Sequence, residues 1–452
     1  MNVRQGIFKW LSTALFWVLL NDYASASSSS VAVTIEGASY SREVVNAVFK
    51  VANSGSTTIS PEQFMQSIVD DALLARYAVS TLGQAALDKN VDVGFPVFAW
   101  IEGQQVSIIQ SAYREQLAIF RQQNKEVRLE LLLTYKENID SDKAKRILQD
   151  YGQVYALSEA LLAEADSVVV AQYRLPNLEP QPISLAEVYR RQNVQGRIKL
   201  HQLSTAYLRE QILLLVEHKL TLWWASKYSD LGLHGVDDLK SMVSARYYAQ
   251  RLRAEMGVVL DMHDDNPALS AVYKEITQQE INQYYEANKE KFKRIDSVVA
   301  RHIQTKTQQD AENALELLKR GEVFDSVARK LSIAADAAGA HPGSLPRITH
   351  EDKSQNWLKS VLYALPPGEL SKPIRSPVQA EAAVVWEVFM VDERVESYFE
   401  ADSETVRYLS RKIIAQNKLN SRYEQLKKSL HEAAKIEIND RWMHEASQII
   451  SG

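Results

Sequence analysis

The chain has 452 residues, of which 46% are apolar and 24% are charged, and its net charge is −5. This length allows two to four domains, and this composition is typical of a globular protein rather than a disordered one. Acidic and basic residues are interspersed, which argues against the clustered basic face of a nucleic-acid-binding protein, and the absence of cysteine excludes disulfides, thiol nucleophiles and thiolate metal sites.

The N-terminal residues have the pattern of a secretory signal peptide. Arg4 and Lys9 lie before and at the edge of the apolar run WLSTALFWVLL at 10–20, and the small residues ASA follow at 24–26. The run is shorter than the roughly 20 residues that a transmembrane helix needs. We therefore expect residues 1–26 to be a cleaved signal and the mature chain to be exported, periplasmic and soluble. An uncleaved signal acting as an inner-membrane anchor is the alternative.

Residues 27–275 are predicted to form a mostly helical region that begins with a strand. The stretch VAVTIEGASYS at 31–41 alternates apolar and polar residues and turns at Gly37. The segment 59–78 predicts an amphipathic helix with Ser60 as its cap. The region is therefore expected to open with a strand and a turn, followed by helices.

Two further patterns in this region concern its repeats and its core. The residues IEGQQVS at 101–107 are similar to IEGASYS at 35–41, which suggests a repeated strand–turn–helix unit. The apolar segment 208–232 predicts a long helix. We place Trp223 and Trp224 of this helix in the core, because large apolar side chains are usually buried. The alternative is an exposed surface that binds client polypeptides.

The periodicity changes after residue 275. A Thr277–Glu280 capping box starts a helix at 276–292, within a connecting segment at 276–296. The apolar run SVVARHIQ at 297–304 predicts a buried strand. Further helices are predicted at 307–321, 323–332 and 356–370, the last broken by Pro366-Pro367-Gly368, and strands at 371–376 and 382–391, around a loop at 334–348. This order predicts a compact α+β domain at 297–394 with a small antiparallel sheet, followed by a helical segment at 395–452.

The segment 297–394 resembles a parvulin-type (PpiC, rotamase) peptidyl-prolyl cis-trans isomerase domain. The matching stretches are ARHIQTK, LKRGEVFDSVARKLS, GSL at 343–345, YALPPGELSKPI at 363–374 and VDER at 391–394. The helix at 276–292 and the helix and strand at 409–440 resemble the flanks of this domain in exported foldases of the SurA and PrsA type, and QFMQSIVDDALLARYA at 63–78 resembles their N-terminal chaperone segment.

This resemblance implies the architecture of the whole chain. It implies a largely helical chaperone module, made from the N-terminal and C-terminal parts, with the parvulin-like α+β domain inserted between them. The region 27–275 corresponds to the N-terminal chaperone region of these foldases. The segment 395–452 is then expected to pack on that region.

The resemblance also implies a site for prolyl isomerisation. The barrier to rotation about a peptide bond is about 18–20 kcal/mol. Lowering it needs no nucleophile, metal or cofactor, only a site that favours the twisted amide over the planar one. The family places a pair of histidines and a polar Asp or Cys at its site. His302 matches the first histidine, and Asp336 is the candidate polar residue although the matching position is Ala334.

Other positions depart from the family pattern. The second histidine is expected at Ala382 or Ala383 and is absent, which puts isomerase activity in doubt. Without a partner to orient it, His302 would be a core histidine with no catalytic role. The family also grips the proline ring with a Met–Phe pair. Its substrate-binding pocket maps to Leu345, Leu358 and Tyr363, whereas the family methionine falls near Ser354, which is polar.

Two functions follow as hypotheses. The first is an exported foldase of the peptidyl-prolyl isomerase family that assists the folding of envelope or secreted proteins, with the isomerase activity retained or lost. Its partners would be unfolded or extended, proline-containing polypeptides, with no nucleic acid, metal or cofactor. The alternative is a non-catalytic periplasmic binding or assembly protein that docks one dedicated partner through the parvulin-like domain.

Overall fold

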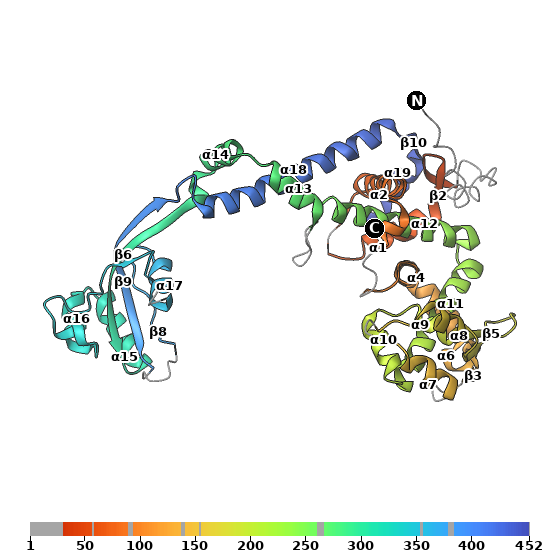
Figure 1. The fold of residues 1–452 in the computed structure, drawn as a ribbon, viewed down its shortest axis with the longest axis horizontal. Coiled ribbons are helices and arrows are strands. Elements are labelled where there is room, and N and C mark those ends of the chain that lie inside the picture. The colour runs from red at the N-terminus through yellow and green to blue at the C-terminus, as the bar shows by residue number, and fades with distance from the viewer. Residues whose placement is uncertain are drawn as a thin grey trace, which may run out of the picture. The chain divides into compact units, whose positions relative to one another are not determined.

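The computed structural model describes residues 30–56, 58–88, 94–136, 141–152, 155–259, 266–352, 356–377 and 384–451. The chain divides into two compact units, one made of Met1–Ala268 with Leu419–Gly452 and the other of Leu269–Lys418. Figure 1 labels the elements of both units. The predicted signal peptide at 1–26 lies outside the described residues. Within the described ranges no helix is both long and apolar enough to cross a membrane.

The first unit begins with a hairpin. Strands β1 (Val31–Ile35) and β2 (Ala38–Ser41) are antiparallel and are joined by Glu36 and Gly37, which both have positive φ, at 51° and 84°. Two such residues form the tight turn whose twist matches that of a hairpin. The other edge of β1 pairs with β10 (Ile436–Ile438), which gives the sheet order β10-β1-β2.

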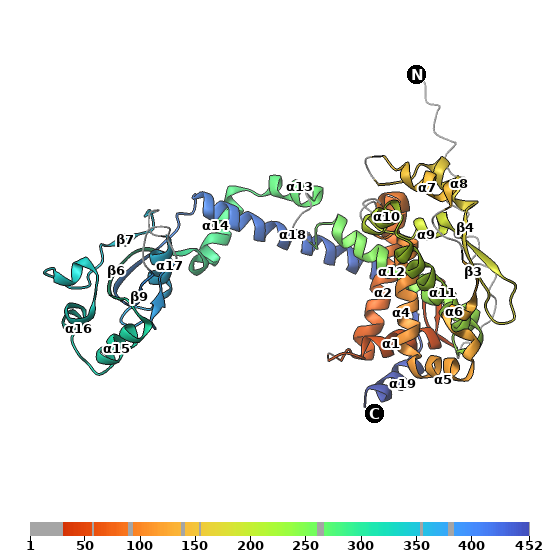
Figure 2. The same cartoon turned by 90° about the horizontal axis from the view of Figure 1, so that it is seen from below.

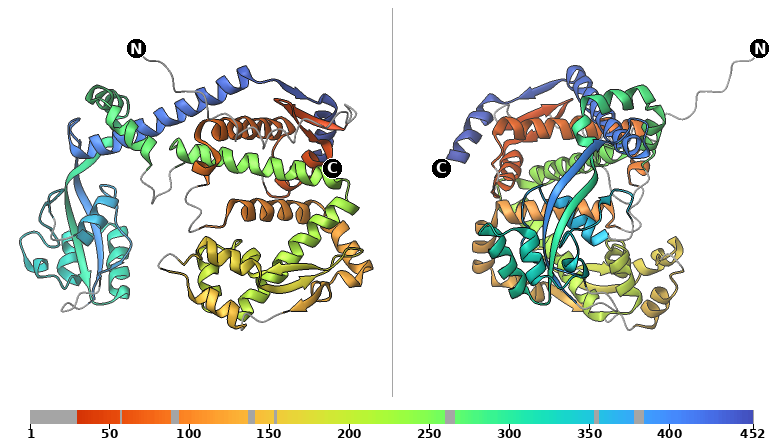
Figure 3. Two further views of the ribbon diagram at one scale, coloured as in Figure 1. Left: turned by 45° about the vertical axis from the view of Figure 1, so that its right-hand side comes forward. Right: turned by 90° about the vertical axis from the view of Figure 1, so that its left-hand side faces the viewer.

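The main core of this unit contains residues from both ends of the chain. Phe49 and Phe64 have ring centroids 5.0 Å apart, and the ring of Trp442 lies 5.7 Å from Phe49. The indole Nε1–H of the fully buried Trp442 donates to Asn46 Oδ1 over 2.7 Å. Figure 3 shows the long helices of this unit side by side. The helices around this core are α1 (Arg42–Ala52), α2 (Pro61–Leu82), α4 (Val97–Ala112), α5 (Arg114–Gln123), α11 (Thr205–Tyr228), α12 (Gly232–Glu255) and α19 (Asp440–Ser451). The short helix α3 (Gln84–Leu87) contributes Leu87 to a separate cluster.

The predicted elements of this unit are largely confirmed. Ser60 caps α2 through a capping box with Gln63. Trp224 is only 2% exposed, and Trp223 is partly buried against the same core. The predicted repeat at 101–107 is wrong, because these residues lie within α4. The short IEG sequence therefore forms a turn in one place and a helix in the other, since the flanking residues set the periodicity.

A second sheet in this unit was not predicted. Strands β3 (Leu133–Lys136), β4 (Val169–Tyr173) and β5 (Gln181–Ser184) are antiparallel in the order β3-β4-β5, and Figure 2 labels β3 and β4 beside the neighbouring helices. They share a separate core, which includes Ile147 and Ile183, with the adjacent helices. Those short elements are η2 (Lys125–Val127), α6 (Leu129–Leu132), α7 (Asp142–Gln149), α8 (Glu159–Asp166), α9 (Leu185–Tyr189) and α10 (Val194–His201).

A repeated strand–turn–strand–helix motif relates the second sheet to the first. In the first hairpin Val31 pairs with Ser41, and the register shifts before Val33. In the second hairpin Val169 pairs with Ser184, and the register shifts at the same place. Each hairpin leads directly into a helix, α1 or α9, and each has its third strand on the same edge. The unit β1-β2-α1 is thus repeated as β4-β5-α9, with a longer hairpin loop that hides it from sequence comparison.

The second unit has the predicted α+β fold with a small antiparallel sheet. Its order is β7-β6-β9-β8, and the two central strands are long. The sheet consists of β6 (Lys293–Thr305), β7 (Ile348–Thr349), β8 (Ile374–Arg375) and β9 (Trp386–Tyr398). The helices are α13 (Pro267–Glu275), α14 (Gln278–Ala287), η3 (Lys289–Phe292), α15 (Gln308–Lys319), α16 (Phe324–Leu331), η4 (Ala335–Ala338), α17 (Asn356–Ala364) and the start of α18 (Glu404–Ala433).

The helices cover opposite faces of the central strands. One face, with Ile303 and Val388, packs against α15 and α16. The other face, with Ala300 and Phe389, packs against α17. Figure 1 shows α16 and α17 on the two sides of the β6–β9 pair. The capping box of Thr277 and Glu280 is confirmed, but the connecting segment is helical only to Ala287, apart from the turn at η3, and β6 already begins at Lys293.

Candidate active site

The candidate site lies on the α17 face of the central strands. In the antiparallel pairing of β6 with β9, His302 is opposite Phe389, and Gln304 is opposite Glu387. Directly paired residues project from the same side of a sheet, and so do residues two apart on one strand. The register therefore places His302, Gln304, Glu387 and Phe389 together on one face.

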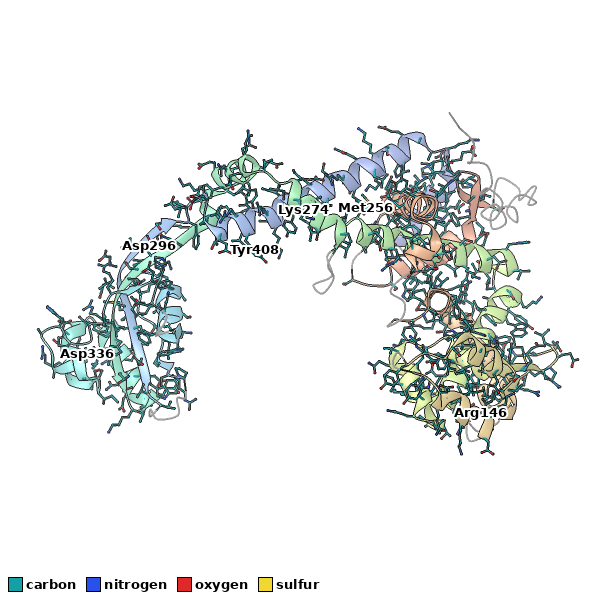
Figure 4. The ribbon with its side chains drawn as sticks, in the orientation of Figure 1. Arg146, Met256, Lys274, Asp296, Asp336 and Tyr408 are labelled. Atoms are coloured by element: carbon teal, nitrogen blue, oxygen red, sulfur yellow. The ribbon has the colours of Figure 1, made fainter. Side chains whose placement is uncertain are left out.

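Two carboxylates contact the imidazole ring of His302. Its Nδ1 lies 2.6 Å from Oε2 of Glu387, and its Nε2 lies 3.1 Å from Oδ2 of Asp336. The ring also stacks on Phe389, with centroids 6.2 Å apart and an interplanar angle of 20°. The Glu387 side chain is 7% exposed and the Asp336 side chain 30%, so one end of the imidazole is enclosed and the other is near solvent. Figure 4 labels Asp336 in this unit.

The environment of His302 favours its charged form. Burial by itself would lower the pKa of the imidazole, because a charged group loses hydration. The hydrogen bond and negative charge of Glu387, together with those of Asp336, outweigh that effect and raise the pKa of His302 above its usual value. An imidazolium donates from both ring nitrogens, which matches an acceptor at each end.

The loop after η4 forms backbone hydrogen bonds with β6 at this histidine. The backbone N–H of His302 donates to the carbonyl of Gly343 over 2.7 Å, and the N–H of Leu345 donates to the carbonyl of Ala300 over 3.0 Å. Gly343 has a φ of +77°, and a Cβ at this position would clash with the carbonyl oxygen of His302. Only glycine lets the loop approach β6 this closely.

Replacing Gly343 with alanine should therefore disturb the site. We expect Gly343→Ala to destabilise the second unit by about 1–3 kcal/mol, through the positive φ and the backbone clash together. Gly368→Ala is the matched control, because Gly368 has a φ of +81° but a Cβ added there would have nothing within 4 Å. Urea unfolding of both variants separates the clash from the backbone strain. Equal losses in the two variants would show that the close approach to His302 contributes nothing.

The predicted pocket residues belong to the apolar cluster on the same face of the sheet as the histidine. Leu345, Leu358 and Tyr363 are partly buried and pack against the apolar cluster that contains Phe389, the residue on which His302 stacks. Trp357, on α17, approaches Phe389 edge-on with centroids 6.0 Å apart. Phe389 therefore contacts both this apolar cluster and His302, whereas Tyr363 lies toward Arg394, whose guanidinium donates to the Tyr363 carbonyl.

Asp336 contacts His302 in the structure, whereas three other positions considered for the site lie outside the described residues. Asp336 reaches His302 although Ala334 is the matching position, because the short helix η4 turns the aspartate toward β6. Ala382, Ala383 and Ser354 lie outside the described residues. The described residue that contacts Nδ1 of His302 from the last strand is Glu387, which sequence reasoning missed. The sequence feature that could have identified Glu387 is a single acidic residue inside the apolar run VVWEVFMV at 384–391.

Comparison with known proteins indicates the domain family of the second unit. Residues 276–407 match the family model of the PPIC-type PPIASE domain. The second unit therefore contains a peptidyl-prolyl isomerase domain of the parvulin type. The resemblance of this segment to the PpiC, parvulin-type family that the sequence indicated is confirmed.

Three individual proteins are similar to the chain over different lengths. The foldase protein PrsA of Caldanaerobacter subterraneus is 28% identical over 128 residues, which cover 27% of this chain and 40% of that protein. Among solved structures, PrsA from Bacillus subtilis is 19% identical, with a TM-score of 0.19, over 59% of this chain and 94% of that chain. A SurA-like chaperone structure from Campylobacter jejuni is 10% identical, with a TM-score of 0.25, over 91% of this chain and 99% of that chain.

Proposed function

We propose that the chain is an exported foldase whose second unit catalyses prolyl cis-trans isomerisation in unfolded envelope or secreted proteins. The observation that carries the proposal is the contact of both ring nitrogens of His302 with carboxylates, on the face of the sheet whose apolar cluster includes Leu345, Leu358 and Tyr363. The signal-like residues 1–26 support export. In this proposal His302 and Asp336 are the catalytic residues.

The chemistry requires differential binding rather than a covalent step. When the amide twists, its nitrogen loses conjugation and becomes a better hydrogen-bond acceptor. The Nε2–H of His302 lies at the more exposed end of the site, next to Asp336, and is the donor that the substrate amide meets. Leu345, Leu358 and Tyr363 hold the proline ring. A donor that binds the twisted amide more strongly than the planar one lowers the barrier.

The first unit would bind the unfolded client. Large apolar side chains are exposed on it, including Phe95 at 52%, Phe98 at 50% and Leu214 at 48%. Contiguous exposed apolar surface is typical of sites that bind other polypeptides, and Phe95 and Phe98 lie three residues apart in the sequence. Client recognition would then be apolar and of low sequence specificity.

One observation favours a second candidate function. His302 is only 8% exposed, and both of its ring nitrogens already have partners within the domain. A histidine held this way is also what a purely structural role requires. The chain would then be a non-catalytic periplasmic binding or assembly protein that docks one partner through the parvulin-type domain.

The variant Asp336→Asn separates these functions. We expect it to lower kcat/KM for isomerisation of a proline-containing peptide by about tenfold or more, because it removes the charge beside the donor while keeping the shape. Suppression of aggregation of an unfolded client should be unchanged. Glu322→Gln, an exposed position in the same unit, is the control. A wild-type chain that suppresses aggregation without catalysing isomerisation would contradict the enzyme and support the binding protein.

A further inference from the structure

Glu387 is a buried carboxylate at the enclosed end of the candidate site. It lies in the centre of the sheet, and its side chain is 7% exposed. Burying a carboxylate costs several kcal/mol unless it is paired and hydrogen-bonded. Both of its oxygens face β6, since Oε2 lies 2.6 Å from Nδ1 of His302 and Oε1 lies 3.5 Å from the amide nitrogen of Gln304. The carboxylate is therefore directed at the histidine by the strand pairing itself.

The two carboxylates that contact His302 come from different kinds of segment. Glu387 belongs to β9, one of the two long central strands, and Phe389 on the same strand supports the ring face. Asp336 belongs to a four-residue 3-10 helix, and its side chain is 30% exposed. The buried carboxylate of the central strand thus orients the ring, whereas the more exposed segment supplies the acceptor on the solvent side.

We propose that Glu387 is the positioning residue of the site, whose carboxylate holds the His302 ring so that Nε2–H points toward Asp336 and the substrate amide. The inference rests on the isomerase function proposed above. Glu387 does not touch the substrate and acts through His302. Glu387, His302 and Asp336 then work as one hydrogen-bonded unit across the sheet.

This arrangement gives the activity a defined pH dependence. The charged groups that face the His302 ring are Glu387 from β9 and Asp336 from η4. Arg301 of β6 pairs with Asp392 on the opposite face, and Lys359 of α17 donates to backbone carbonyls away from the ring. Because the two acids stabilise the imidazolium, activity should fall as pH rises through the raised pKa of His302.

The test compares Glu387→Gln, Glu387→Asp and the wild type. We expect Glu387→Gln to lower kcat/KM by about tenfold or more and to move the falling limb of the pH profile to lower pH, because it removes the charge that holds the proton on His302. Glu387→Asp should recover part of the lost kcat/KM and part of the shift in the pH profile. Glu393→Gln, on the same strand but 55% exposed, is the matched control. NMR titration of the His302 ring measures the shift in its pKa without an activity assay. Circular dichroism checks that each variant is folded.

The outcomes separate this inference from the proposed function. If the wild type is active and Glu387→Gln matches it in rate, pH profile and His302 titration, the positioning role is wrong and the isomerase remains. If the wild type is inactive at every pH, the isomerase proposal fails and the positioning role fails with it. Loss of rate in Glu387→Gln with an unshifted His302 titration, or with no recovery in Glu387→Asp, also overturns the inference.

Discussion

His302→Leu is expected to destabilise the second unit by about 3–5 kcal/mol, because it leaves the Glu387 carboxylate buried without its charged partner. Gln304 alone cannot replace that partner, since its amide nitrogen lies 3.5 Å from the carboxylate. Urea unfolding at pH 6 and at higher pH values measures the loss. Its pH dependence has a definite sign. The raised pKa of His302 contributes stability that is fully present below the pKa of the unfolded chain, roughly 6.5, and is lost as pH rises through the folded value.

The double variant His302→Leu with Glu387→Leu is the decisive control. Replacing both members of a buried ion pair with apolar residues is often neutral or stabilising, whereas removing one member is costly. Both positions lie on the face that packs against the apolar cluster around Phe389. We therefore expect the double variant to unfold near the wild-type urea midpoint. If its loss equals or exceeds that of His302→Leu, the pair is not what stabilises this face.

The architecture of the second unit could be predicted from local sequence, but its site only in part. The run SVVARHIQ predicted β6, and the capping residue Thr307 predicted the start of α15. His302 and Asp336 were found by motif and by proximity along the chain. Glu387 was missed because its role depends on the register between β6 and β9. His302 and Glu387, which this register brings together, are 85 residues apart in the sequence. Register of that kind depends on tertiary pairing.

The first unit shows the same limit in its fold. The hairpin of β1 and β2 was visible because Glu36-Gly37 forms a short, recognisable turn. The equivalent hairpin of β4 and β5 has a longer loop and was hidden in a region that looked helical. The similarity of 101–107 to 35–41 instead pointed to α4, where the same letters lie within a continuous helix. Seven residues do not determine secondary structure, because packing against distant segments decides between the alternatives.

The packing of α19 into the core of the first unit predicts a second large change in stability. Trp442 of α19 is fully buried against Phe49 and Phe64, and it is the largest side chain that this segment contributes to the core. We expect Trp442→Ala to lower the free energy of unfolding of this unit by about 3–5 kcal/mol, through lost burial and the cavity left behind. The variant also leaves Asn46 Oδ1 without its indole donor. Thermal or urea unfolding measures the change.

The neighbouring Arg441→Ala is the control, because the Arg441 side chain is 70% exposed and its removal should change stability by no more than about 0.5 kcal/mol. Hydrogen exchange adds a second readout. Because β10 pairs with β1 immediately before α19, loss of the tryptophan should speed exchange of the β1 and β10 amides and leave those of β4 and β5, which have a separate core, protected. Uniform loss of protection in both sheets would mean that the unit unfolds as one body. A change below about 1 kcal/mol would mean that the C-terminal segment only covers a core that is already complete without it.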